Sequence, residues 1–170
     1  KGAGECDLHV HVGPAPRLLP KQATVLSSEA WVAAVSRPSG LSLPAKESEN
    51  IVGAVYAGIL GGAQVFRDAL GRPEVYRPNF FFNGFSGRPQ PMPASDESWP
   101  KRRYVGNVLM PGAGSVGSAA AFFMHLFGIE ASLTVLDRDL VKIENFGRSP
   151  IFGLKNYCKP KAAALAAALT

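Results

Sequence analysis

Three glycines between an apolar run and a helix-forming run make up the stretch of this sequence best suited to hold a phosphate. Residues 108–123 read VLMPGAGSVGSAAAFF, with glycines at Gly112, Gly114 and Gly117. Where a strand turns into a helix, the first glycine permits the bend, the second exposes bare backbone to a ligand, and the third lets helix and strand pack closely. The helix N-terminus adds free amide hydrogens and a partial positive charge. We therefore predict that Gly112, Gly114 and Gly117 bind a nucleotide phosphate.

An acidic residue follows at the distance that such a site requires. Asp137 lies twenty residues after Gly117, at the end of the apolar stretch SLTVLD. A carboxylate at this place can accept hydrogen bonds from both hydroxyls of a ribose. A Rossmann oxidoreductase that binds NAD or FAD would use the same residues, so the nucleotide stays open at this point. A glycine turn that serves packing alone is a further alternative.

The segments around the turn alternate between strand and helix patterns. The stretches RYVGNVLM at residues 103–110 and SLTVLD at residues 132–137 predict two buried strands, and VGSAAAFFMHLFGI at residues 116–129 predicts the helix between them. A strand, a helix and a second strand in this order form a βαβ unit. The expected fold class is α/β, with a Rossmann-like, mostly parallel sheet flanked by helices. The chain stops inside an alanine-rich helical pattern, so we expect a piece of a longer protein, truncated after the second βα unit.

Residues 1–102 are predicted to form an N-terminal region that precedes the nucleotide-binding domain of residues 103–170. Its first 50 residues combine prolines and glycines with short apolar alternations, which are typical of short strands and loops. An apolar helix follows at about residues 50–70, with Asn50 as its N-cap and Gly71 just past its end. Its uncharged part is shorter than the ~20 residues of a membrane span, so we expect a core helix whose small residues allow close packing.

The last part of this region, residues 71–102, contains six prolines. Proline disrupts helix interiors and central strands, so we expect an irregular connector through most of this range. Four phenylalanines are expected to anchor the connector to a hydrophobic surface, namely Phe80, Phe81, Phe82 and Phe85.

The composition limits the classes of function. The chain is 46% hydrophobic and 18% charged, which is ordinary for a folded domain. Its net charge of +5 is spread along the chain and too small to predict nucleic-acid binding. Cys6 and Cys158 form neither a disulfide framework nor a CxxC zinc site, and His9 and His11 lack a third ligand, so no metal site is predicted. Without a signal segment, we expect a cytoplasmic protein that binds neither membrane nor nucleic acid.

The residues after Asp137 favour ATP over a dinucleotide. The stretch VLDRDLVKIENFGRSPIFGLKNYCKPK at residues 135–161 resembles the ThiF/MoeB/HesA group of ubiquitin-activating-type adenylating enzymes. In that group the glycine turn is followed by D-x-D-x-V-x-x-x-N-x-x-R and then by G-x-P-K at a helix start. The resemblance extends over about residues 105–170. The matching positions are Asp137, Asp139, Val141, Asn145, Arg148, Pro160 and Lys161.

The resemblance implies a role for each polar position. It places Asn145, Arg148 and Lys161 around ATP, with Arg148 and Lys161 as the catalytic contacts to phosphate. Asp139 joins the nucleotide site or caps the turn that follows Asp137. Two positions depart from the family: Ser149 stands where Gln is frequent, and Cys158 stands where Gly is usual, which requires the backbone of a side-chain-bearing residue to adopt a glycine-like angle.

The resemblance also implies partners and further cofactors. The carboxylate that is adenylated is expected to be the C-terminus of a ubiquitin-like or sulfur-carrier protein, and a homodimer is expected. The magnesium-associated aspartate and the zinc cysteines of the family are expected beyond Thr170, so the fragment alone is expected to be inactive. An NAD- or FAD-binding oxidoreductase and a non-catalytic ThiF-like module that pairs with an active partner are the alternatives.

Overall fold

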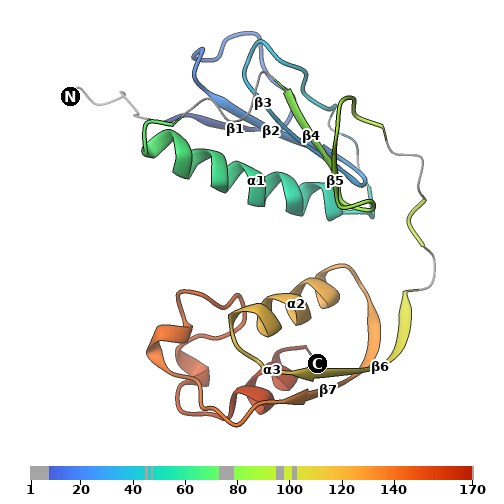
Figure 1. Ribbon diagram of the computed structural model, residues 1–170, viewed down its shortest axis with the longest axis vertical. Helices are drawn as coiled ribbons and strands as arrows, with labels where there is room; N and C mark the ends of the chain where they lie inside the picture. The colour runs from blue at the N-terminus through green and yellow to red at the C-terminus, as the bar shows by residue number, and fades with distance from the viewer. Residues whose placement is uncertain are drawn as a thin grey trace. The chain divides into compact units, whose positions relative to one another are not determined.

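The structure is a computed structural model that describes residues 8–44, 46, 48–72, 79–94, 98–100 and 103–169. The chain divides into two compact units, Lys1–Trp99 and Pro100–Thr170. Each unit contains its own sheet and at least one α-helix (Figure 1). Cys6, one of the two cysteines considered above, lies outside the described residues.

The first unit is a five-stranded sheet with the strand order β1-β2-β3-β4-β5. The strands are β1 (Val10–Val12), β2 (Thr24–Glu29), β3 (Val32–Ser36), β4 (Asn79–Asn83) and β5 (Arg88–Gln90). Only β1 and β2 pair in parallel, and the other three pairs are antiparallel. The prediction of a mostly parallel sheet is therefore wrong for this unit. For the β2–β3 and β4–β5 pairs the physical reason is the short connection, because a tight loop such as Ala30 and Trp31 between β2 and β3 can join only antiparallel strands.

Strand β4 contradicts the prediction of an irregular connector at residues 71–102. It lies inside the sheet between β3 and β5, and its Phe81 is 2% exposed in a cluster with Val32 and Ala34. The prolines did not exclude it because β4 itself contains none. Pro89 lies in β5, an edge strand, where the missing amide hydrogen is tolerated. Phe81 is an anchor as predicted, whereas Phe85 stays 61% exposed.

Helix α1 (Val52–Ala69) covers one face of this sheet and agrees with the helix predicted at residues 50–70 (Figure 1). The N-cap residue is Ile51 rather than the predicted Asn50. Asn50 lies one residue earlier, and its Oδ1 atom accepts a hydrogen bond from the Val52 amide at 3.0 Å. Gly71 follows the helix at a φ of 66°, the left-handed conformation that favours glycine. None of the helices in the described part of the chain combines the length and hydropathy that crossing a membrane requires.

Two glycines bring α1 into close contact with the sheet. A Cβ atom on Gly53 would lie 2.5 Å from the Val32 carbonyl oxygen, and one on Gly61 would lie 2.3 Å from the Leu26 Cδ1 atom. No side chain fits at the first of these positions without moving the backbone. The predicted close packing of the glycine-rich helix is confirmed.

A polar network fixes the end of α1 to strands β2 and β3. Asp68 Oδ1 accepts hydrogen bonds from Arg37 Nη2 at 3.0 Å and from Gln64 Nε2 at 2.6 Å. Asp68 Oδ2 accepts one from Thr24 Oγ1 at 3.4 Å. The side chains of Arg37 and Asp68 are only 18% and 10% exposed, so the pair is largely shielded from water.

Replacing Asp68 by alanine should therefore destabilise the protein. Asp68→Ala removes the carboxylate that pairs with the largely shielded Arg37 guanidinium, and removal of one partner of a buried pair costs about 3 kcal/mol. Urea unfolding, followed by circular dichroism, measures the change. The exposed Glu49→Ala is the control and should shift the free energy of unfolding by less than about 0.5 kcal/mol. Equal urea midpoints for the two variants would show that the network contributes nothing.

The second unit contains the predicted βαβ unit. Strand β6 (Tyr104–Pro111), helix α2 (Ser115–Leu126) and strand β7 (Glu130–Leu136) follow one another, and the two strands pair in parallel. Two short 3-10 helices, η2 (Ile143–Asn145) and η3 (Leu154–Asn156), lead to helix α3 (Lys161–Leu169).

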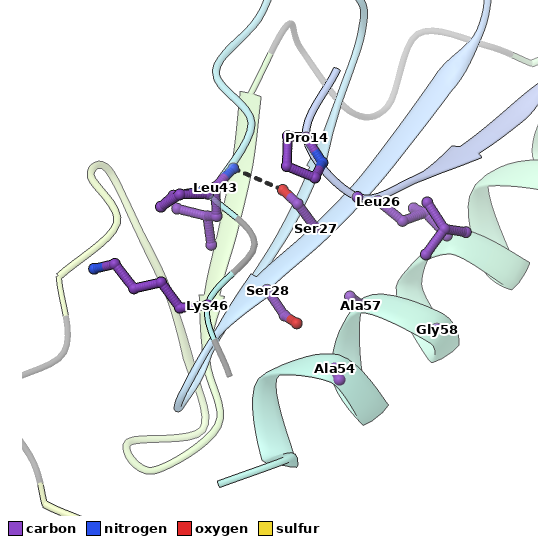
Figure 2. A pocket seen from close by; sticks show the side chains of 12 residues that line it. Pro14, Leu26, Ser27, Ser28, Leu43, Lys46, Ala54, Ala57 and Gly58 are labelled. Atoms are coloured by element: carbon purple, nitrogen blue, oxygen red, sulfur yellow. Dashed lines mark hydrogen bonds between the residues drawn. The ribbon is translucent and has the colours of Figure 1, made fainter. Parts of the chain in front are cut away.

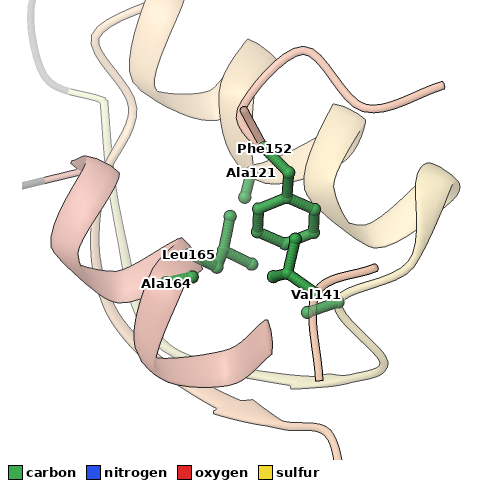
Figure 3. Packing of buried hydrophobic residues seen from close by; sticks show 6 residues of the cluster. Ala121, Val141, Phe152, Ala164 and Leu165 are labelled. Carbon is green, nitrogen blue, oxygen red and sulfur yellow. The ribbon is translucent and has the colours of Figure 1, made fainter. Parts of the chain in front are cut away.

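The core of this unit joins the helices to one face of the parallel pair (Figure 3). Met110, Leu133 and Val135 pack from the strands against a buried cluster. On the opposite face Leu109 and Leu136 are 62% and 56% exposed. Among the described residues, helices therefore cover one face of the β6–β7 pair, whereas the prediction placed helices on both sides of the sheet. The cluster consists of Ala113, Ala121, Val141, Phe152, Ala164 and Leu165.

Candidate nucleotide site

The glycine turn lies where β6 ends and α2 begins, and each of its glycines has a separate geometric reason. Gly112 has a φ of 108°, and its amide donates to the Leu136 carbonyl oxygen at 2.7 Å. A Cβ atom on Gly117 would lie 2.0 Å from the Gly112 carbonyl oxygen, so this position excludes every side chain. A Cβ atom on Gly114 would meet nothing within 4 Å. The backbone at Gly114 is therefore bare and open, as a phosphate-binding turn requires.

Helix α2 starts at this open backbone without a side-chain cap. Gly114 is its N-cap residue and has no side chain that could accept a hydrogen bond from the first turn. The first turn of a helix leaves amide hydrogens without intrahelical partners, and an anion satisfies them well. The turn therefore fits a phosphate in both shape and charge.

Asp137 directly follows β7 and is tied to the turn. Its Oδ2 atom accepts a hydrogen bond from the Ala113 amide at 2.7 Å, and its Oδ1 atom accepts one from the Asp139 amide at 2.8 Å. The carboxylate therefore holds the glycine turn and its own loop in place. Each carboxylate oxygen has two lone pairs, so both retain capacity for a ribose hydroxyl. The Ala113 amide is a partner that no side-chain pattern in the sequence could reveal.

Lys161, the first residue of α3, is paired with Asp139. Lys161 Nζ lies 3.1 Å from Asp139 Oδ2, and the Lys161 amide donates to the Asp139 carbonyl oxygen at 2.9 Å. The hydrogen bond and the charge of Lys161 hold the pKa of Asp139 below its ordinary value, so Asp139 is ionised at neutral pH. The side chain of Lys161 is 10% exposed and that of Asp139 is 59% exposed. The ammonium group is thus held at a partly shielded position rather than extended into water.

Asn145 and Arg148 lie in the loop that starts with η2. Asn145 is 6% exposed, and its Oδ1 atom accepts a hydrogen bond from the Lys142 amide at 2.8 Å, so it stabilises its own turn. Arg148 is exposed, and its guanidinium makes no hydrogen bond or ion pair with another residue that the structure describes. The contacts therefore link the glycine turn, Asp137, Asp139 and Lys161 into one chain, and they leave the Arg148 side chain outside it.

A pair of serines, which the sequence did not single out as a pair, connects this loop to α2. Ser149 Oγ donates to Ser118 Oγ at 2.9 Å, and Ser118 is fully buried. The Ile151 and Phe152 amides both donate to Ser149 Oγ at 3.3 Å. Ser149, at a position where the family often has Gln, therefore orders the loop next to Arg148. A serine inside the apolar helix pattern of α2 was the signal that could have identified Ser118.

Cys158 has the glycine-like backbone angle that its position predicts. Its φ is 60°, and its amide donates to the Val141 carbonyl oxygen at 2.9 Å, which fixes the backbone there. The thiol is free and exposed. A residue with a Cβ atom in this region stores conformational strain.

Cys158→Gly should therefore stabilise the protein slightly. Relief of the left-handed strain is worth about 1 kcal/mol, and the greater freedom of glycine in the unfolded chain offsets part of it, which leaves a gain of about 0.5 kcal/mol. Thermal unfolding of Cys158→Gly beside Cys158→Ser measures the gain, because the serine variant retains the Cβ atom. A lower melting temperature for the glycine variant than for the serine variant would show that no strain is stored there.

Among the residues that the structure describes, no group of three or more His, Cys, Asp and Glu side chains is placed to hold a metal ion. The contacts that the site does contain join a glycine turn, an acidic loop and a helix that begins with lysine. A search of curated proteins finds no match. The sequence profile of the ThiF family matches residues 100–170, the segment that contains the glycine turn, Asp137, Asp139 and Lys161.

Proposed function

We propose that this protein uses ATP to adenylate a carboxylate, and that the carboxylate is the C-terminus of a ubiquitin-like or sulfur-carrier protein. The match of residues 100–170 to the ThiF family supports an E1-like adenylation fold. The observation that carries the proposal is the chain of contacts from the glycine turn through Asp137 and Asp139 to Lys161. The acyl substrate and the catalytic roles below are parts of this proposal.

In this reaction the main task of the protein is to position two anions, the carboxylate and ATP. A carboxylate oxygen attacks the α-phosphorus of ATP, an acyl–phosphate anhydride bond forms, and the bond to the β-phosphate breaks as pyrophosphate leaves. Catalysis then depends on orienting the two anions and on neutralising the charge that spreads over the phosphate oxygens. ATP supplies the activated phosphorus, and the protein supplies amide hydrogens and cations.

Each site residue has a proposed task in this reaction. The open backbone at Gly114 binds phosphate, and Asp137 accepts hydrogen bonds from the ribose. The Lys161 ammonium group gives up part of its contact with Asp139 and binds a phosphate oxygen of ATP. Arg148, whose guanidinium has no partner among the described residues, is available for a second phosphate contact. No described residue is assigned to magnesium or zinc, and the cytoplasmic location and the homodimer stay predictions from the sequence.

The ligand distinguishes this proposal from an oxidoreductase. The protein should bind ATP more tightly than NAD, and Asp137→Ala should weaken ATP binding about tenfold through the loss of the ribose contacts. Isothermal titration calorimetry measures both affinities. Because Asp137 also holds the Ala113 amide, the melting temperature of the variant must be measured beside its affinity. Equal affinity for NAD, accompanied by hydride transfer, would favour the oxidoreductase.

The function itself is tested by ATP–pyrophosphate exchange. Addition of a carrier protein with a C-terminal glycine should start exchange of labelled pyrophosphate into ATP, and removal of that glycine should stop it. ATP binding without exchange, for the complete protein and a set of such carriers, would favour the non-catalytic module.

A further inference from the structure

One edge of the sheet in the first unit is open at a single residue of β2. Alternate residues of a strand direct their amide and carbonyl groups to opposite sides. The Leu26 carbonyl oxygen accepts a hydrogen bond from the Gly13 amide at the end of β1, so Leu26 and Ser28 both face the β1 side. The Ala30 carbonyl oxygen accepts one from the Gly53 amide at the start of α1. Ser28 lies between Leu26 and Ala30, whose carbonyl oxygens are both already hydrogen-bonded.

On the β1 side, the backbone of Ser28 has no hydrogen-bond partner in the described part of the chain. Strand β1 ends at Val12, which pairs with Leu26, and α1 begins only opposite Ala30. The Ser28 amide and carbonyl groups therefore face a gap. Unpaired backbone groups at a sheet edge are a template for another strand.

A cavity of about 330 Å³ lies at this gap. Figure 2 shows the Ser28 hydroxyl on the side of β2 that faces α1, near Ala54 and Ala57. The rest of the lining is largely apolar, and small residues of α1 leave the room that larger side chains would fill. The apolar part includes Pro14, Leu26, Leu43, Ala54, Ala57 and Gly58.

The walls of the cavity are fixed by contacts that do not use Ser28. The Leu43 amide donates to Ser27 Oγ at 2.8 Å, which holds the loop of Leu43 against β2 (Figure 2). At the rim, Lys46 forms an ion pair with Glu29. Because these two charges neutralise each other, the rim favours an uncharged segment over a charged chain terminus.

We propose that this cavity binds an extended peptide segment of another protein. The backbone of the segment pairs with the amide and carbonyl groups of Ser28, and an apolar side chain of the segment enters the cavity. Main-chain hydrogen bonds provide affinity in this mode, and the pocket beside the strand provides preference for the side chain. The residues of this site belong to the first unit and lie outside residues 100–170, so none of them is a residue of the proposed adenylation site.

The probe for this site is a synthetic peptide, acetylated and amidated, with the sequence Thr-Leu-Thr-Leu-Thr. Titration into the ¹⁵N-labelled full chain should shift the Ser28 amide resonance. Two control peptides separate the two parts of the proposal. Serine in place of both leucines removes the apolar side chains, and N-methylation of the two leucines removes backbone donors. Each change should weaken binding about tenfold.

Two matched glycines of α1 test the cavity. A Cβ atom on Gly58 or on Gly62 would meet nothing within 4 Å, and both positions are exposed, so either accepts a side chain without a clash. Gly58 lines the cavity, whereas Gly62 is not among its lining residues. Gly58→Leu should fill the cavity and weaken peptide binding at least about tenfold, while Gly62→Leu should leave the affinity unchanged. Both variants should melt at or above the temperature of the parent chain, because leucine is a better helix former than glycine.

Three results would overturn the proposal. The first is a titration in which the Ser28 resonance does not move. The second is equal loss of affinity in Gly58→Leu and Gly62→Leu. The third is a Ser28 resonance that moves on dilution of the protein alone, since this would show that a second copy of the chain occupies the edge.

Discussion

Gly117→Ala should disrupt the glycine turn, whereas Gly114→Ala should leave the fold intact and reduce ATP binding. The Cβ atom of an alanine at position 117 would lie 2.0 Å from the Gly112 carbonyl oxygen, and this backbone atom cannot move without opening the turn. Overpacking of this kind costs about 3 kcal/mol. Urea unfolding measures the loss, and ATP affinity should fall with it because the turn is displaced.

Gly114 is the matched control for this effect. Its φ of −72° suits alanine, and a Cβ atom there meets nothing within 4 Å, so the free energy of unfolding should change by less than about 1 kcal/mol. The same Cβ atom would occupy the space through which a phosphate approaches the backbone, so ATP affinity should fall at least about tenfold. Unchanged ATP affinity in Gly114→Ala would show that the turn serves packing alone.

Lys161→Ala and Arg148→Ala should each reduce ATP–pyrophosphate exchange by about ten- to a hundredfold. A charge-assisted contact to phosphate contributes about 1.5 to 3 kcal/mol, which corresponds to one to two decades in affinity or rate. Lys155→Ala is the control, because Lys155 is exposed and lies in the same part of the chain. It should exchange like the parent protein.

Stability separates the two roles that Lys161 could have. Lys161 pairs with Asp139, but Asp139 is largely exposed, and its carboxylate can be solvated when the lysine is absent. Lys161→Ala should therefore melt close to the parent protein while losing exchange. A variant that loses stability and exchanges normally once folded would show that the pair is structural, and normal exchange in both Lys161→Ala and Arg148→Ala would favour the non-catalytic module.

The sequence predicted the second unit well because its signals are local. The strand–turn–helix pattern, the three glycines and the acidic residue at its fixed distance all follow from backbone geometry within one βαβ unit. The strain at Cys158 was also predictable, because a residue with a side chain at a position where the family usually has glycine is expected to adopt a glycine-like backbone angle. The pairing of Lys161 with Asp139 was not predicted, because it depends on how the loop returns after twenty-two residues.

The first unit was predicted less well because its contacts are not local. Strand β4 is short, lies among prolines, and becomes a central strand only because β3 and β5 supply its partners. The open edge at Ser28 depends on where β1 ends and where α1 begins. Both places are far from Ser28 along the chain, so the residues around Ser28 do not predict the open edge. The antiparallel order of the sheet likewise became evident only once the pairs were known.

Titration of the ¹⁵N-labelled chain with ATP and with NAD tests the nucleotide site most directly. ATP is expected to shift the amide resonances of residues 113–115 and of Asp139 at lower concentration than NAD, while the Ser28 resonance in the other unit stays in place. The same titration of Gly114→Ala should show these shifts only at higher ATP concentration. If ATP leaves residues 113–115 unmoved, or if NAD shifts them at the same concentration, the turn is not an ATP site.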